Sequence, residues 1–160
     1  NRKNQFDDQG ILISSQQAKN LYFSKLDKLI SEAEKKSINV ILFAPMPMFR
    51  DIKLTNIDGY CNKEWFRPIK PVECYENNNL NKKEEIKNRL SPIYEGLDNL
   101  AIKHNNLYIY DTFEHFCPNE ICKRNKNEIN LFRDGDHLSR KGSLSLTNNF
   151  MAFLKENKLI

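Results

Sequence analysis

The residues best suited to chemistry lie close together near the C-terminal end of the sequence, between Phe132 and Ser143. Asp134 stands three residues before His137. A carboxylate and an imidazole on one tight turn can hydrogen-bond each other, so that the carboxylate fixes the tautomer and the other ring nitrogen is free to act as a base. The spacing therefore predicts a general base, His137, oriented by Asp134. Such a pair needs a nucleophile to activate.

The residues around this pair favour a turn that brings Asp134 and His137 together over a coincidental spacing of the two residues. Gly135 permits a tight turn, Asp136 places a second carboxylate beside the pair, and Ser139 can cap the helix that follows. The competing interpretation is that the two aspartates only enrich a helix N-terminus in negative charge. Physical reasoning about the residues leaves both interpretations open.

The elements that would position this turn begin with a helix over residues 15–36, capped by Ser14 or Ser15. Apolar residues at helical spacing predict one buried stripe along it, formed by Tyr22, Leu26, Leu29, Ile30 and Ala33. The almost uniformly apolar run 39–44 then predicts a parallel strand covered on both faces. Prolines end that strand, and the loop 44–49 is either a wall of the site at the carboxyl edge of a sheet or a plain strand end.

A second helical pattern covers residues 79–105, and Pro92 is expected to kink or restart it, with Ser91 as a possible cap. Its predicted buried face consists of Ile86, Leu90, Ile93, Leu97, Leu100 and Ala101. His104 near its end is expected to be a favourable C-terminal charge and not a catalyst. Residues 107–110 predict the next strand, which ends in Asp111. A carboxylate at a strand end could be functional, but capping of the following turn is the favoured interpretation.

The segment from 112 to 133 is predicted to be a loop, in which His115 is a surface or packing residue. Ser139 is then expected to cap one final helix. Its apolar residues are expected largely to face the core, namely Leu144, Leu146, Phe150, Phe153 and Leu154. The serines at positions 14, 15 and 139 are better explained as helix caps than as nucleophiles.

The four cysteines form two local pairs, Cys61 with Cys74 and Cys117 with Cys122. Neither pair has the spacing of a zinc knuckle, and histidine is scarce between them. Two local disulfides are favoured over free buried thiols and over a metal site, and they would place the domain outside the cytosol. The irregular segment 50–80 would be pinned by the first pair, and Trp65 is expected to pack under that loop more readily than to line a substrate groove.

Composition limits the remaining function classes. The 160 residues suit a single domain, and the net charge of +4 comes from interspersed basic and acidic residues on predicted helix surfaces. We therefore expect no nucleic-acid partner and no metal. No apolar run approaches the roughly 20 residues that span a bilayer. Because the sequence begins at Asn1 without an initiator Met, we expect it to be part of a longer chain.

Several blocks, in order, carry a resemblance to a known family. From about Ser15 to the C-terminus the sequence resembles the SGNH (GDSL-like) hydrolase superfamily. More narrowly, it resembles the SGNH domain that follows the membrane acyltransferase-3 domain in bacterial cell-surface O-acyltransferases. The matching blocks are Phe43-Ala-Pro-Met-Pro47, Cys61 with Trp65-Phe-Arg-Pro68 and Cys74, Ile109-Tyr-Asp111, Phe116-Cys-Pro118 with Cys122, and Phe132-Arg-Asp-Gly-Asp-His-Leu-Ser139 with Gly142.

The resemblance implies an α/β fold, an SGNH/flavodoxin-like three-layer domain with a parallel sheet and a Ser–His–Asp triad at the carboxyl edge. His137 would be its base and Asp134 the orienting carboxylate. The family's first block, a Gly-Asp-Ser, and its oxyanion-hole blocks have no match in this sequence. Residues 1–160 are therefore expected to be the C-terminal portion of a single SGNH-type domain, incomplete at its N-terminus and inactive alone.

The resemblance also implies a function for the full-length protein. It would transfer an acyl group, expected to be acetyl, to hydroxyls of a bacterial surface glycan such as lipopolysaccharide O-antigen or an exopolysaccharide. No bound cofactor is expected, because a membrane acyltransferase-3 domain in cis would relay acyl groups from acetyl-CoA. That domain would tether the protein on the extracytoplasmic face. The alternatives are an esterase that uses water as acceptor and a non-catalytic glycan-binding module.

Overall fold

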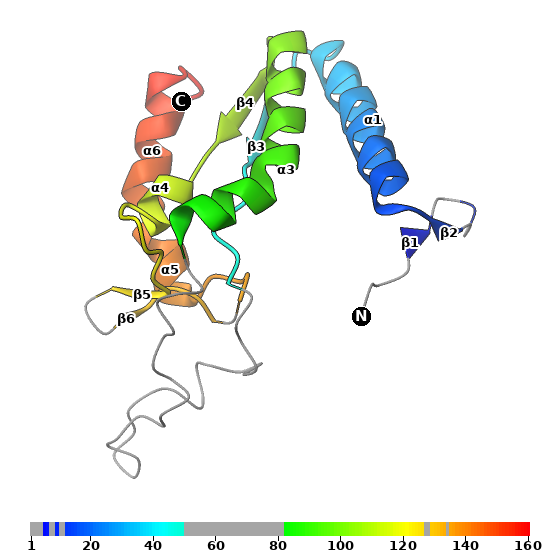
Figure 1. Cartoon of the computed structure of the whole chain (residues 1–160). Coiled ribbons are helices and arrows are strands. Elements are labelled where there is room, and N and C mark those ends of the chain that lie inside the picture. The colour runs from blue at the N-terminus through cyan, green and yellow to red at the C-terminus, as the bar shows by residue number, and fades with distance from the viewer. Residues whose placement is uncertain (1–4, 7–8, 10–11, 50–81, 127–128, 134) are drawn as a thin grey trace. The chain divides into compact units, whose positions relative to one another are not determined.

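The computed structural model describes residues 5–6, 9, 12–49, 82–126, 129–133 and 135–160 (Figure 1). The chain divides into two compact units. The first contains Asn1–Leu42 and Glu95–Ile109, and the second contains Phe43–Tyr94 and Tyr110–Ile160. The predictions that concern Trp65 and the Cys61–Cys74 pair lie outside the described residues.

Two short strands, β3 (Val40–Phe43) and β4 (Leu107–Tyr110), form a two-stranded sheet. The main-chain N–H of Val40 donates to Asn106 at 2.8 Å, and that of Ala44 donates to Tyr110 at 3.0 Å, so both strands run in the same direction. Helix α3 (Lys83–Lys103) lies between them in the sequence, which is the order of a βαβ connection. The chain is therefore an α/β protein with a small parallel sheet, as the sequence predicts.

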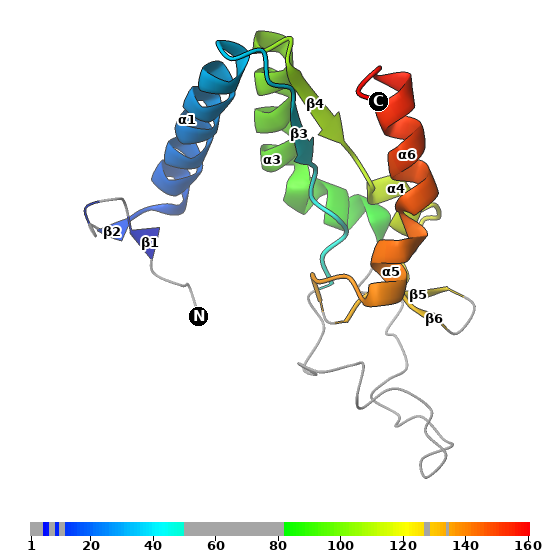
Figure 2. The ribbon, with the colours of Figure 1, turned by 180° about the vertical axis from the view of Figure 1, so that it is seen from behind.

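In the first unit, helix α1 (Ser15–Glu34) is capped as predicted by Ser14, whose side chain accepts from the main-chain N–H of Gln17 at 3.2 Å. A two-residue strand pair, β1 (Gln5–Phe6) with β2 (Leu12–Ile13), precedes it (Figure 2). The core of this unit consists of Ile30, Leu100 and Leu107, with Phe23, Leu26, Val40, Leu42 and Ala101 packed against it.

The predicted stripe on α1 is only partly correct. Ile30 is fully buried, but Tyr22 is 56% exposed and Leu29 is 60% exposed, so these two residues do not face the core. Phe23 takes part in the core in their place. Helical spacing alone does not decide which of two neighbouring apolar residues, such as Tyr22 and Phe23, faces the core, because the apolar face of a helix is wide enough for either to lie at its edge.

The second unit contains the remaining elements: α4 (Phe113–Phe116), the antiparallel pair β5 (Asn125–Lys126) and β6 (Ile129–Asn130), α5 (Arg140–Ser145) and α6 (Thr147–Glu156). The segment predicted to be a plain loop thus holds a helical turn and a hairpin. A disulfide joins Cys117 to Cys122, which confirms the second of the two predicted bridges. Both cysteines lie in the core of this unit, which also contains Phe49, Ile86, Leu90, Phe113, Phe116, Leu131, Phe132 and Leu146.

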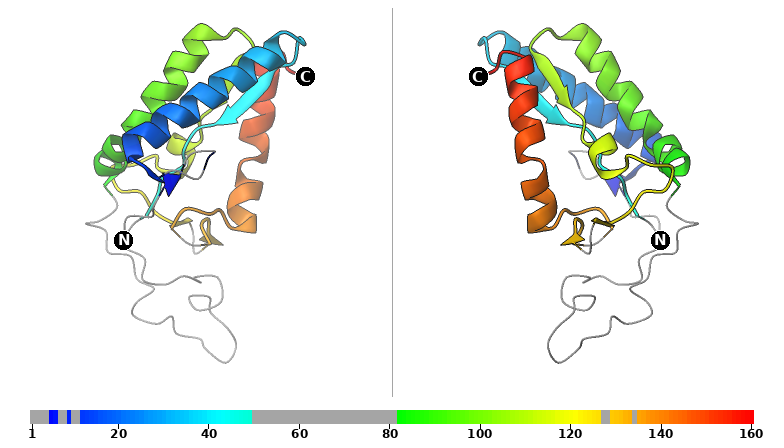
Figure 3. Two further views of the ribbon diagram at one scale, coloured as in Figure 1. Left: turned by 90° about the vertical axis from the view of Figure 1, so that its right-hand side faces the viewer. Right: turned by 90° about the vertical axis from the view of Figure 1, so that its left-hand side faces the viewer.

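Three further predictions need correction. Helix α3 runs through Pro92 as one helix, so of the predicted kink or restart the restart does not occur. Ser91 is not a cap, because its hydroxyl donates to the carbonyl of Asn88 within the helix. The single helix predicted after Ser139 is divided at Leu146 into two helices, and α6 follows α5 directly (Figure 3). Leu144, which the sequence predicts to face the core, is 61% exposed.

Strand β3 also differs from its prediction. Residues 40–42 are half-buried and Phe43 is 61% exposed, so the strand is not covered on both faces as its composition predicts. Among the described residues, no helix combines the length and the apolar character needed to cross a bilayer.

Candidate active site

The turn that bears His137 is closed by main-chain contacts at its base. Phe132 and Leu138 form an antiparallel bridge, and the N–H of Arg133 donates to the carbonyl of His137 at 2.8 Å. Phe132 is fully buried in the core of the second unit. The turn therefore stands on a buried aromatic anchor, and its tip carries the polar residues.

Ser139 ties the C-terminal side of this turn to the chain before it. Its N–H donates to Leu131 at 2.9 Å, its hydroxyl donates to the carbonyl of Asn130 at 2.6 Å, and it accepts from the N–H of Gly142 at 3.0 Å. This confirms the predicted helix cap. A Cβ on Gly142 would lie 1.9 Å from the carbonyl oxygen of Leu131, so only glycine permits this approach.

The side chain of His137 is 72% exposed and lies at the surface of the second unit. Its Nδ1 lies 3.1 Å from Oδ1 of Asp136. Asp134, which the spacing predicts to be the orienting carboxylate, lies outside the described residues. Of the two carboxylates that sequence analysis places beside the imidazole, the structure thus locates one.

The loop that follows β3 reaches this turn. The N–H of Phe49 donates to the carbonyl of Gly135 at 2.8 Å. The same loop is fixed from α3, because the Tyr94 hydroxyl donates to Pro45 at 3.0 Å and Nη2 of Arg89 donates to Met48 at 2.9 Å. The loop 44–49 therefore borders the turn that bears His137.

A cavity of about 360 Å³ opens at the same end of the strands. Its lining includes Phe43, Met46, Tyr110, Leu138, Leu146 and Phe150, and none of its lining residues is charged. Leu138, the neighbour of His137, contributes to one wall. Such an apolar space at the carboxyl ends of parallel strands suits an uncharged group.

Asp111 ends β4 and acts as predicted. Its Oδ1 accepts from the N–H of Phe113 at 2.8 Å and lies 3.1 Å from the hydroxyl of Tyr94. The carboxylate thus caps the turn into α4 and lies beside Tyr94 of α3. We assign it no chemical step.

A serine–histidine contact lies elsewhere in this unit. Nε2 of His115 lies 3.0 Å from the hydroxyl of Ser145, and that hydroxyl also donates to the carbonyl of Gly142 at 2.7 Å. A carbonyl can only accept, so the serine proton points to Gly142 and the imidazole is the donor to the hydroxyl. His115 therefore does not act as a base toward Ser145. Its ring packs edge-on against Phe116, which agrees with the predicted packing role.

The third histidine, His104, lies in the first unit and is only 3% exposed. Its Nε2 lies 2.6 Å from Asp27 and its Nδ1 lies 3.3 Å from Glu34. The hydrogen bond to Asp27 is the main cause that raises the pKa of His104. Both ring nitrogens are occupied, so this residue is a buried ion-pair partner and not a base. The prediction of a simple charge at a polar helix end missed its burial.

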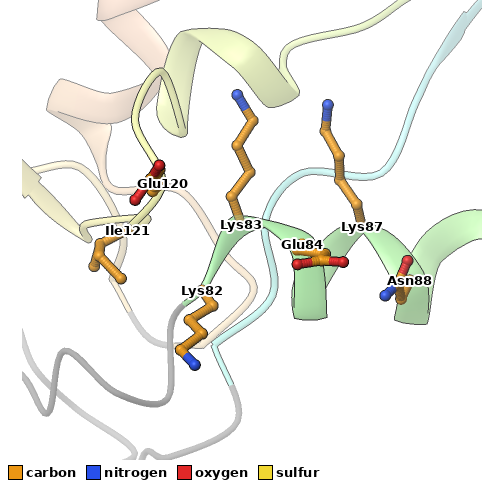
Figure 4. A pocket seen from close by; sticks show the side chains of 7 residues that line it. All are labelled: Lys82, Lys83, Glu84, Lys87, Asn88, Glu120 and Ile121. Atoms are coloured by element: carbon orange, nitrogen blue, oxygen red, sulfur yellow. The ribbon is translucent and has the colours of Figure 1, made fainter.

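A surface pocket of about 580 Å³ lies at the start of α3 (Figure 4). Figure 4 shows the side chains of Lys83 and Lys87 extending in a common direction while Lys82 points away from them. Both of the extended lysines pair with Glu114. One carboxylate thus offsets part of the charge of the two lysines, in keeping with the solvated helix face that the sequence predicts.

In the part of the chain that the structure describes, no group of three or more His, Cys, Asp and Glu side chains is arranged to hold a metal.

Comparison with known families decides the assignment. The family described as "SGNH domain (fused to AT3 domains)" matches residues 2–152 of the sequence. The chain belongs to this SGNH domain family. The match confirms the resemblance carried by the cysteine-bearing loops and the His137 turn, and it covers nearly the whole chain. No curated protein and no solved structure matches the sequence.

Within the SGNH domain, the α/β character agrees with the described strands and helices. Among the located residues, His137 is exposed at a turn fixed by Ser139, Gly142 and the loop after β3. No sequence signal pointed to the contact between Phe49 and Gly135, since the two residues are far apart in the chain.

Proposed function

We propose that this SGNH domain takes part in the transfer of acyl groups to hydroxyls of a bacterial surface glycan, with His137 as general base. The observation that carries the proposal is an exposed imidazole on an anchored turn in a chain of the SGNH family fused to acyltransferase-3 domains. An exposed base can reach both a nucleophile and an incoming acceptor, as acyl transfer requires.

The reaction has two balanced steps. A serine oxygen attacks the acyl carbonyl of the donor while His137 takes the serine proton, and the tetrahedral intermediate then expels the leaving group, which receives that proton. A glycan hydroxyl next gives its proton to His137 and attacks the acyl-serine. Collapse of the second intermediate forms the glycan ester, and the serine oxygen recovers the proton from the imidazole.

The orienting carboxylate in this proposal is Asp134, as the family resemblance implies. Its function is to hold Nδ1–H and to stabilise the imidazolium that forms. Asp136, at 3.1 Å from Nδ1, is a second negative charge beside the same ring and stabilises the same cation.

The nucleophile in the proposal is the serine of the family's Gly-Asp-Ser block, which has no match in residues 1–160. The hydroxyl groups of Ser14 and Ser139 cap helices, and that of Ser145 is hydrogen-bonded to His115 and Gly142, so we do not assign the nucleophile to these residues. The described part of the chain thus contributes the base, its turn and the wall beside it.

The wider setting of the proposal rests on the family. An acyltransferase-3 domain in cis would supply acyl groups drawn from acetyl-CoA and would tether the protein to the membrane. The Cys117–Cys122 disulfide supports an extracytoplasmic position, because such bonds persist in oxidising compartments.

The test uses the full-length protein in cells from which the chromosomal copy has been deleted. His137→Ala should abolish O-acylation of the surface glycan, measured as ester signals in its proton NMR spectrum, while His115→Gln should retain it. Unchanged acylation by His137→Ala would contradict the catalytic role and favour a binding module. Release of free acid in place of glycan ester by the wild-type protein would point to the esterase alternative.

A further inference from the structure

We propose that Phe49 is a positioning residue for His137, and that it fixes the catalytic turn against the carboxyl end of β3. This inference rests on the proposed function, because it concerns the same imidazole. It assigns to the loop after β3 a role in setting the geometry of the base.

The first link is a main-chain hydrogen bond. The N–H of Phe49 donates to the carbonyl oxygen of Gly135 at 2.8 Å, two residues before His137. The opposite side of the turn is closed by the bond from Arg133 to the carbonyl of His137. The tip that bears the imidazole is therefore held both from within the turn and from the loop 44–49.

The second link is the aromatic ring of Phe49, which is only 4% exposed. It meets the ring of Phe132 edge-on, with the centroids 5.1 Å apart. Phe132 in turn bridges to Leu138, the residue after His137. One side chain thus anchors the loop to the base of the turn, while its main chain anchors the loop to the tip.

Two arginines hold this phenylalanine in place. The guanidinium carbon of Arg124 lies 6.0 Å from the centroid of the Phe49 ring, and Arg89 donates to the carbonyl of the preceding residue, Met48, at 2.9 Å. Rotation of the ring or displacement of its main chain would therefore disturb several contacts at once.

This anchoring has a catalytic consequence because the imidazole itself is 72% exposed. Little of the protein surrounds the ring, so the position of His137 depends strongly on the main chain of the turn, in addition to the carboxylate of Asp136 that lies 3.1 Å from Nδ1. A displacement of about 1 Å can cost on the order of 10²-fold in rate when a reacting group leaves its productive geometry.

The chain offers a matched control in Phe116. Its ring also meets Phe132 edge-on at 5.1 Å, and it is 3% exposed in the same core. Its main-chain N–H, however, donates to Thr112 and not to the turn. Loss of this ring should weaken the core as much as loss of Phe49, without moving Gly135.

The experiment measures turnover of p-nitrophenyl acetate by the full-length protein carrying Phe49→Leu, Phe116→Leu or Phe49→Tyr. We expect Phe49→Leu to lower kcat at least tenfold with KM within twofold, and to shift the acidic limb of the pH–rate profile. Phe116→Leu, with a similar loss of thermal stability, should keep kcat within threefold. Phe49→Tyr, which keeps the ring contacts, should restore most of the rate.

Equal losses of kcat in the two leucine variants, or a kcat for Phe49→Leu close to that of the wild type, would overturn the positioning role. A failure of the proposed function is distinct, because it appears as undiminished turnover by His137→Ala. If His137→Ala is inactive and Phe49→Leu is not, only the inference about Phe49 is wrong.

Discussion

Nε2 of His104 lies 2.6 Å from Oδ1 of Asp27, and the opposite ring nitrogen faces Glu34 at 3.3 Å. Two carboxylates on α1 therefore face one imidazole at the end of α3, and Lys103 also pairs with Asp27. Both nitrogens can donate only when the ring is protonated. The arrangement stabilises the imidazolium, which is why the pKa of His104 is raised.

The first prediction concerns stability at alkaline pH. The folded pKa of His104 lies above its unfolded value of about 6.5, so its contribution is complete below that value and is lost as pH rises through the folded pKa. The free energy of unfolding, measured with urea across pH 5–9, should fall on the alkaline side. His104→Gln should remove this fall and cost about 1–3 kcal/mol at pH 6.

His115 provides a control of opposite sign. Burial, with a smaller contribution from Lys126, lowers the pKa of His115, so its neutral form is favoured in the folded protein. Stability should therefore fall as pH drops below about 6.5, and His115→Gln should reduce that acidic loss while leaving the alkaline one. If the free energy of unfolding falls by the same amount at alkaline pH in His104→Gln and in the wild-type protein, the stabilising ion pair of His104 with Asp27 and Glu34 is contradicted.

The second prediction concerns the Cys117–Cys122 disulfide. It closes a loop of about six residues, for which chain entropy gives roughly 2 kcal/mol. Replacing both cysteines by alanine should lower the free energy of unfolding by at least that amount, since both residues are buried in the core of the second unit. Mass spectrometry after alkylation of the unreduced protein should find neither of these thiols modified. Ready alkylation of both would contradict the bridge.

The third prediction concerns Gly142. Alanine in place of a helical glycine normally favours the helix by about 1 kcal/mol. At this position the new Cβ would lie 1.9 Å from the carbonyl oxygen of Leu131, so Gly142→Ala should instead lower the melting temperature. Lys141→Ala, at an exposed neighbouring site, should leave it nearly unchanged. A higher melting temperature for Gly142→Ala would show that the approach to Leu131 is not as close as described.

Local patterns predicted the elements well. Apolar residues at helical spacing located α1 and α3, short apolar runs located both parallel strands, and side-chain chemistry located the caps at Ser14, Asp111 and Ser139. These features depend on residues within a few positions of each other, which a sequence displays directly. The short strands β5 and β6 were missed because two-residue elements carry no periodicity.

Features that depend on distant residues could not be predicted in the same way. The exposure of Tyr22 and Leu29, the burial of His104 between carboxylates and the contact of Phe49 with Gly135 all depend on which helix faces or loops meet. The position of His137 on a fixed turn was predictable, since Gly135 and Ser139 flank it. Which segment borders the turn of His137 could not be predicted, because the contact with loop 44–49 joins residues far apart in the sequence.

The central claim is that His137 is the general base of an acyl transfer. The most direct measurement is kcat for p-nitrophenyl acetate with the full-length protein and its His137→Gln variant, a substitution that keeps a polar side chain on the exposed turn. General-base catalysis contributes about 10²–10⁴-fold, so the account predicts a loss of kcat within that range with a similar KM. A variant that retains kcat within twofold of the wild type would contradict it.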